Sequence, residues 1–223
     1  MQLAETCEKC PLSKTRNKIV WGEGAPDAPI MMIAEAPGEW EDKMGRPFWY
    51  QARAGAELEK LLMMNRLSRD LCYVTNSVKC RPPRNRDPKP EESIACQPWL
   101  LQELQACSPV IIVTIGRFAT QFFLGDNITM EQVHGIPFEV QVPQAREKPF
   151  LVVPVFHPGA ALRSPEMMLR CQLDFRAVAE ILRGNISRTR IKDPYEGKEL
   201  YNVLESAPEV AERLEADFGG DRY

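Results

Sequence analysis

Four cysteines, grouped in two pairs that lie far apart in the chain, constrain most strongly how this sequence can fold. Cys7 and Cys10 form a CxxC pair near the N-terminus, whereas Cys80 and Cys96 lie near the middle of the chain in Pro- and Arg-rich sequence. Four thiolates can bind a zinc ion or an iron–sulfur cluster. Such a site would tie the first residues to a mid-chain loop and would give that loop a fixed shape.

The spacing of these cysteines leaves the bound metal open. Zinc sites usually contain two short knuckles, and here only the N-terminal pair is a knuckle. This asymmetry favours an iron–sulfur cluster without excluding zinc. A CxxC redox pair with two unrelated core cysteines is less favoured, because Cys80 and Cys96 lie in hydrophilic sequence rather than in apolar runs.

Composition narrows the class of protein. The 223 residues are 44% hydrophobic and 26% charged, which fits one large globular domain with or without a tail. The net charge of −3 means that any nucleic-acid site would be a local basic patch. No apolar stretch approaches the length of a membrane span or resembles a secretory leader. With an odd count of seven cysteines, we expect a reducing, cytoplasmic location, with Cys72, Cys107 and Cys171 as reduced thiols of the core.

Apolar runs and helical periodicity alternate along the chain. Four apolar runs predict buried strands, at residues 29–36, 71–78, 110–116 and 150–156. Helical patterns fill the gaps, at residues 54–65, 90–106, 117–124 and 165–182. This alternation predicts an α/β fold with a mostly parallel, four-stranded sheet covered on both faces. Ligands bind such sheets at the carboxyl ends of the strands.

The composition changes near residue 184. We therefore expect one domain over residues 1–184 and a charged tail or linker over residues 185–223, which could also lead into a further domain. Residues 185–223 show no clear strand, and residues 206–218 read as a capped helix.

Polar side chains follow three of the expected strands. Glu35 opens a run of four carboxylates that includes Glu41, and the residues alone favour a solvated acidic turn. Asn76 is more typical of a turn or a strand-end cap, although its amide also suits the edge of a base. His157 comes directly after a buried strand and fits a structural or a functional role equally, while His134 is interpreted as structural.

Two loops carry features suited to nucleic acid. Residues 45–50 (GRPFWY) place three aromatics in succession, beginning with Phe48, which predicts a surface for stacking a flat ligand. Residues 79–89 (KCRPPRNRDPK) hold the densest positive charge, including Arg81, Arg84 and Arg86. A phosphate contact fits this loop better than a merely solvated one, because flanking cysteines would hold it rigid.

Together these segments resemble the family 4 uracil-DNA glycosylases, the iron–sulfur branch of the uracil-DNA glycosylase superfamily. The resemblance rests on CxxCPL at 7–12, EAPGxxED at 35–42, GRPF at 45–48, TNxVKCRPPxNR at 75–86 and FHPxxxLR at 156–163. Each motif is weak alone, and their order and spacing over roughly residues 7–182 make the combination specific.

The resemblance implies a three-layer α/β/α sandwich and cleavage of the N-glycosidic bond of deoxyuridine in single- or double-stranded DNA, leaving an abasic site. It implies a structural [4Fe–4S] cluster on Cys7, Cys10, Cys80 and Cys96. We expect a monomer without membrane association.

The same resemblance assigns roles in the pocket. Phe48 would stack on the uracil that is flipped out of the helix, and Asn76 would hydrogen-bond its polar edge. Glu41 would occupy the place of a thymine methyl group and so exclude thymine. Glu35, with backbone groups of its loop, would position the attacking water, and His157 would donate a hydrogen bond to uracil O2 as the bond breaks.

The resemblance also places a loop in the DNA, with Leu162 as a wedge and Arg163 near a phosphate. One departure lies at residues 49–53, which add about two residues between GRPF and the following Ala-Gly and so change a pocket wall. The alternative is therefore a catalytically weak or silent DNA-binding domain with the same fold, belonging for example to the N-terminal part of a phage-type DNA polymerase. An unrelated zinc or redox protein is the least favoured interpretation.

Overall fold

Strands and helices alternate along the main part of the chain. The computed structural model describes residues 6–184, 191–192 and 199–201. The strands are β1 (Ile30–Ala34), β2 (Cys72–Asn76), β3 (Ile111–Ile115), β4 (Phe138–Val140), β5 (Phe150–Val155), β6 (Ile191–Lys192) and β7 (Glu199–Tyr201). The α-helices are α1 (Glu39–Met44), α2 (Arg53–Met64), α3 (Pro90–Ala106), α4 (Arg117–Leu124), α5 (Met130–Val133), α6 (Pro158–Ala161) and α7 (Pro165–Leu182). Three 3-10 turns span Pro11–Lys14, Arg69–Leu71 and Pro83–Asn85.

The main sheet has the strand order β2-β1-β3-β5-β4. Four of its strands are parallel, and β4 pairs antiparallel with β5. Strand β1 lies between β2 and β3 and pairs Ala34 with Asn76 of β2 and Ile33 with Thr114 of β3. Every residue of β1, β2, β3 and β5 is buried, as expected for a parallel sheet covered on both faces.

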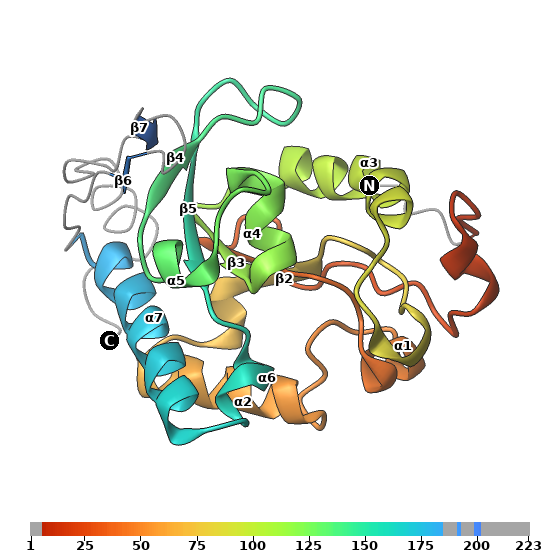
Figure 1. Cartoon of the computed structure of the whole chain (residues 1–223), viewed down its shortest axis with the longest axis horizontal. Helices are drawn as coiled ribbons and strands as arrows, with labels where there is room; N and C mark the ends of the chain where they lie inside the picture. Colours follow the sequence, from red (N-terminus) through yellow and green to blue (C-terminus); the bar gives the residue numbers. More distant parts are fainter. Residues whose placement is uncertain (1–5, 185–190, 193–198, 202–223) are drawn as a thin grey trace.

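Helices cover both faces of this sheet and make three layers (Figure 1). Alternate strand residues such as Met32 and Val153 pack with α2 and α7 on one face. The intervening residues, such as Ile33 and Ile112, pack with α3 and α4 on the other. The predicted α/β sandwich is confirmed in these respects.

The strand count of four was wrong, because β4 adds a fifth strand at the edge. Its three residues, Phe138–Val140, are too short for an alternating pattern to stand out. The expectation of no strand after residue 184 was also wrong, since β6 and β7 form a short antiparallel pair. The helix expected at residues 206–218 lies outside the described residues.

The N-terminal segment lies beside α3, away from the two main cores (Figure 1). Leu12 packs there with Val78, Trp99 and the cysteines of both pairs. This small third core joins the start of the chain to the loop that follows β2. It places the cysteines close to the carboxyl end of that strand.

Candidate active site and cysteine pocket

The carboxyl ends of the four parallel strands meet at one edge of the sheet. Because the strand order is β2-β1-β3-β5, the segments that follow them carry Asn76, Glu35, Arg117 and His157 side by side along this edge. Side chains far apart in the sequence are therefore held on a rigid support at one place.

Asn76 ends β2 and is fully buried, with 1% of its surface exposed. Among the described residues, its Nδ2 atom has no hydrogen-bond partner. An unpaired buried donor costs free energy, so such a group usually awaits a ligand or a water molecule. The side-chain amide therefore does not act as the strand-end cap that the sequence favoured.

His157 follows β5 and caps the N-terminus of α6. Its Nδ1 accepts a hydrogen bond from the Gly159 amide at 3.0 Å. Burial, with a smaller contribution from the Arg163 guanidinium, lowers the pKa of His157 to about 4. At neutral pH the imidazole is thus uncharged, with its proton on Nε2, ready to donate.

Asp174 anchors the His157 loop, and the sequence analysis missed it. This buried carboxylate accepts a hydrogen bond from the Phe156 amide at 2.8 Å and contacts His134 Nδ1 at 2.6 Å. Burial raises the pKa of Asp174, and the His134 hydrogen bond opposes the rise. The sequence signal that could have revealed Asp174 is an acidic residue on the apolar face of α7. The contact between His134 and Asp174 agrees with a structural role for His134.

Phe48 faces His157 across the site, with ring centroids 5.6 Å apart and an angle of 28° between the planes. Its φ of 45° is rare for a residue with a side chain, and such conformations cluster at functional sites. Glu41 holds it there, because Oε1 accepts the Phe48 amide at 2.6 Å while Oε2 accepts the Gly38 amide. Burial raises the pKa of Glu41, and these two backbone hydrogen bonds oppose the rise.

The run of carboxylates after β1 is not a solvated acidic turn. Asp42 is buried and accepts the Asn17 amide at 2.9 Å, which ties the N-terminal segment to α1. Glu35 and Glu41 are half-buried, and only Glu39 is exposed. Spacing along the chain could not show this, because the partners come from other segments.

Glu35 differs electrostatically from an ordinary surface carboxyl group. Its pKa is raised to about 7, mainly by burial; the Asp87 carboxylate contributes to this rise, and the Arg117 guanidinium opposes it. A carboxyl group with a pKa near the working pH is suited to exchange or hold protons during a reaction.

The inserted residues 49–53 fold back against the start of α2. Trp49 and Tyr50 contact each other with ring centroids 4.4 Å apart. A Cβ atom at Gly55 would lie 2.1 Å from the Trp49 carbonyl oxygen and 2.8 Å from that of Phe48, so glycine is required for this approach. The insertion borders an open pocket lined by Glu23, Arg46, Pro47, Phe48, Trp49, Tyr50, Glu59 and Arg69.

The basic side chains of the loop after β2 differ in burial and in their hydrogen-bond partners. Lys79 is 1% exposed and does not belong to a surface patch, contrary to the sequence interpretation. Arg86 makes a bidentate pair with the buried Glu92, at 2.8 and 2.7 Å. Arg81 donates to Asn85 Oδ1 at 2.6 Å, whereas Arg84 is exposed.

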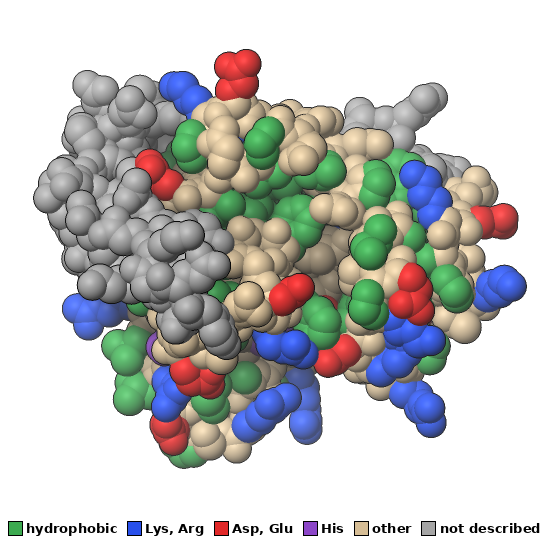
Figure 2. Space-filling view, turned by 45° about the horizontal axis from the view of Figure 1, so that its top comes forward, with side chains coloured by type: hydrophobic (Ala, Val, Ile, Leu, Met, Phe, Trp, Pro, Cys, Tyr) green, Lys and Arg blue, Asp and Glu red, His purple; other side chains and the backbone are tan. Residues whose placement is uncertain are grey.

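The loop at the end of α6 is also exposed. Leu162 has 48% of its surface exposed, and the neighbouring Arg163 is exposed as well. Acidic and basic side chains are interspersed on the face shown in Figure 2, which agrees with the small net charge.

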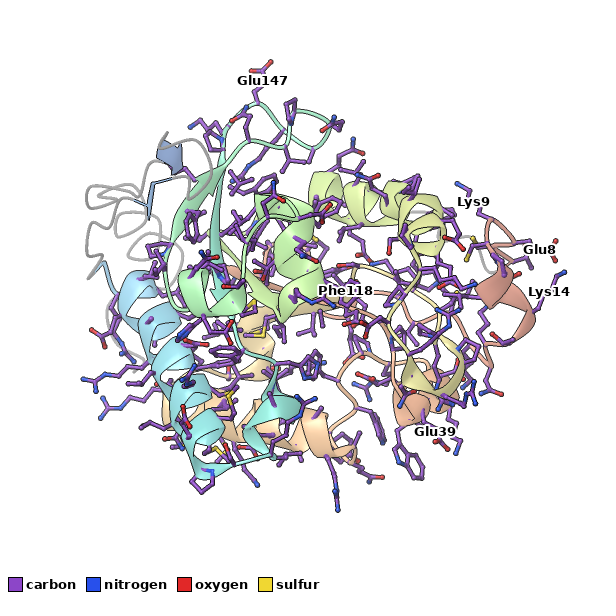
Figure 3. All side chains as sticks on the ribbon, in the orientation of Figure 1. Glu8, Lys9, Lys14, Glu39, Phe118 and Glu147 are labelled. Carbon is purple, nitrogen blue, oxygen red and sulfur yellow. The ribbon has the colours of Figure 1, made fainter. Side chains whose placement is uncertain are left out.

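The four cysteines of the sequence pattern line one pocket, together with Arg16, Trp99 and six other residues. Arg16 Nη1 donates to Cys80 Sγ at 3.4 Å, and the Lys79 amide donates to Cys96 Sγ at 3.2 Å. The Lys9 ammonium, labelled at the right of Figure 3, lies 4.6 Å from the centre of the Trp99 ring. Two of the four sulfur atoms thus accept a hydrogen bond from an N–H donor, one of them cationic.

A further polar group lies in the wall of this pocket. Trp99 Nε1 is buried there without a partner in the described part of the chain. Within the described residues, no group of three or more His, Cys, Asp or Glu side chains is arranged so that it could hold a metal ion.

The α/β fold with polar side chains at the carboxyl edge of its sheet can be compared with known proteins, and the comparisons show the family. The chain belongs to the uracil-DNA glycosylase superfamily, whose family model matches residues 21–183. Within it, the chain groups with the type-4 uracil-DNA glycosylases. It is 41% identical to that of Sulfurisphaera tokodaii over 181 residues, 79% of this chain and 80% of the relative. It is 41% identical to that of Thermotoga maritima over 165 residues, 74% of this chain and 82% of the relative.

A more distant relative carries a different type number. The type-5 uracil-DNA glycosylase of Pyrobaculum aerophilum is 32% identical over 127 residues, 49% of this chain and 56% of the relative. None of the helices that the structure describes is long and apolar enough to cross a lipid bilayer.

Proposed function

We propose that this protein is a DNA repair enzyme that flips uracil out of DNA and hydrolyses its N-glycosidic bond, leaving an abasic site. The observation that carries the proposal is the buried Nδ2 atom of Asn76, which has no partner among the residues described and lies at the same sheet edge as the neutral His157. The names of the type-4 relatives agree with this substrate.

Recognition of the base follows from the chemistry of the pocket. Phe48 stacks on the uracil ring, while the Asn76 amide donates to O4 and accepts from N3–H. Cytosine presents the opposite pattern at these two positions and leaves the amide unpaired. Glu41, fixed by two backbone amides, stands where a thymine methyl group would enter and excludes it by contact and by desolvation of the carboxylate.

Bond cleavage releases uracil as an anion. His157 donates its Nε2 proton in a hydrogen bond to O2 and stabilises the developing negative charge, since its other nitrogen is engaged by the Gly159 amide. Glu35, in its ionised form, orients the water that attacks C1′ and receives one of its protons. The glycosidic electron pair leaves with uracil, and the water oxygen forms the new bond.

Contacts to DNA come from two exposed loops. Arg81, Arg84 and Arg86 would face phosphates, with Arg84 the most available because the other two already pair within the protein. Leu162 would fill the space left by the flipped base, and Arg163 would contact a neighbouring phosphate.

Cys7, Cys10, Cys80 and Cys96 would hold a [4Fe–4S] cluster, which would supply a structural link between the N-terminal segment and the loop after β2. The pocket that the four cysteines share supports this assignment. We place the protein in a reducing, cytoplasmic compartment, in which the buried Cys72, Cys107 and Cys171 are thiols of the core. We propose that the protein acts as a monomer.

Uracil release from a labelled oligonucleotide with one deoxyuridine tests the proposal. We expect release by the wild type and a loss of about a hundredfold or more in Asn76→Ala and His157→Ala. Retained DNA binding without release, even at high protein concentration, would instead indicate a silent binding domain, for example one attached to a polymerase.

A further inference from the structure

The ammonium group of Lys79 is buried and lies against the backbone of Asn76 at the end of β2. Its ammonium donates to Asn76 O at 2.6 Å, to Thr75 Oγ1 at 2.7 Å and to Glu103 Oε2 at 2.5 Å. An ammonium has three N–H donors, so these contacts use all of them. The side chain is thus committed to holding the end of β2.

Glu103 completes this arrangement from α3 and is 0% exposed. Its Oε2 also accepts the Thr75 hydroxyl at 2.8 Å, and its Oε1 accepts the Gly22 amide at 3.0 Å. A buried ion pair rarely stabilises a fold more than apolar side chains of the same size would. Its presence beside the pocket therefore points to a need for defined geometry.

The backbone of Lys79 is held by the same helix as its side chain. The Lys79 amide donates to Cys96 Sγ at 3.2 Å, and the next residue is Cys80. Cys96 and Glu103 lie two helical turns apart on α3 and so share one face. One residue thereby connects the cysteine pocket to the strand end that presents Asn76.

The side chain of Asn76 depends on this support. With Nδ2 unpaired among the described residues, the amide direction is set by the backbone at the end of β2. That backbone is paired to Ala34 on one side and held at its carbonyl by the ammonium of Lys79. A shift of about 1 Å in a positioning group can cost about a hundredfold in rate.

We propose that Lys79 and Glu103 are positioning residues that orient Asn76 for uracil recognition and fix it relative to the cysteine pocket. The inference rests on the proposed function of Asn76. It predicts that the pair acts on the base only through Asn76, and that the pair has no direct contact with substrate.

The test uses a neutral replacement of the pair, Lys79→Met with Glu103→Gln. The amide side chain introduced by Glu103→Gln can still accept the Gly22 amide and bond to Thr75, whereas the tether to Asn76 O is removed. Lys60→Met with Glu57→Gln is the matched control, because it neutralises a buried carboxylate and its lysine on α2. Folding and iron content are measured for every variant, so a misfolded protein is recognised as such.

Two readouts decide the proposal. We expect kcat/KM for uracil release to fall about ten- to a hundredfold in the pair variant and about twofold or less in the control. Adding Asn76→Ala to the pair variant should cost no more than Asn76→Ala alone. Wild-type release by the pair variant, or multiplying losses in the triple variant, would overturn the inference.

Hydrogen exchange separates this inference from the proposed function. In the free protein, amides of residues 75–80 should exchange at least about tenfold faster in the pair variant, with the control unchanged. Unchanged exchange there would overturn the positioning role whether or not the wild type releases uracil. Absence of release by the wild type, with faster exchange in the variant, would contradict only the proposed function.

Discussion

The raised pKa of Glu35 predicts an acid limb in the pH profile of uracil release. This pKa is about 7, mainly because of burial, so the ionised form that orients water becomes scarce as the pH falls below 7. At pH 5 only about 1% of Glu35 would be ionised, and release should be roughly fiftyfold slower than at pH 7. His157, with a pKa of about 4, remains neutral over this range and adds no limb above pH 5.

Two charged side chains near Glu35 should allow the midpoint of this acid limb to be shifted in opposite directions. Asp87 and Arg117 form an exposed pair at 3.3 Å, with 68% and 52% of their side chains exposed. Exposed charges contribute about 0.2–1 kcal/mol, which corresponds to roughly 0.1–0.7 pH units. Asp87→Asn should therefore lower the midpoint, because it removes a negative charge and frees Arg117, while Arg117→Gln should raise it.

Single-turnover rates of uracil release between pH 5 and pH 9 measure these midpoints. Both shifts should shrink in about 1 M salt, since the Debye length falls to about 3 Å. Glu35→Gln serves as the control and should be slow with a flat acid side. A limb that persists in Glu35→Gln, or equal shifts in the two charge variants, would refute the assignment.

The remaining predictions concern the cysteine pocket, the insertion and the basic loop. Cys96→Ser should reduce bound iron and visible absorbance of the purified protein to less than half, and unchanged iron per chain would argue against this ligand. Gly55→Ala should lower the free energy of unfolding by about 1–3 kcal/mol because its methyl group meets two carbonyl oxygens, whereas the exposed Met63→Ala on the same helix should change it by less than about 0.5 kcal/mol. Arg84→Ala should lower the slope of log affinity for DNA against log salt by about 1 without loss of stability. Arg86→Ala should instead lower the unfolding midpoint in urea, because it leaves the buried Glu92 with the Lys89 amide but without its ion-pair partner; equal effects of the two substitutions on DNA binding would contradict this division.

Elements whose signal is local could be predicted from the amino-acid sequence. The long apolar runs predicted β1, β2, β3 and β5, and α3, α4 and α7 begin and end where helical patterns predicted. Periodicity and end signals suffice there because each strand is buried along its length and each helix has one apolar face. The three-residue strand β4 was missed because pairing with β5, rather than its own pattern, makes it a strand.

The residues of the candidate site also fall into those with a local sequence signal and those without one. Motif spacing pointed to Cys7, Cys96, Asn76 and His157, and the strand order then brought them to one edge or one pocket. The cysteine pattern and the positions at strand ends are properties of the chain itself, whereas the roles predicted for Asn76 and His157 came from the family resemblance.

Which charges are buried, and with what they pair, depends on how the folded chain packs. Lys79 looked like part of a basic patch, yet Glu103 of a distant helix holds it in the interior. Asp174 looked like an ordinary helix residue, yet it anchors the loop of His157. The sequence shows where charged residues lie along the chain. Their burial and pairing depend on contacts between segments far apart in the chain, and these contacts set the free energy of each charge.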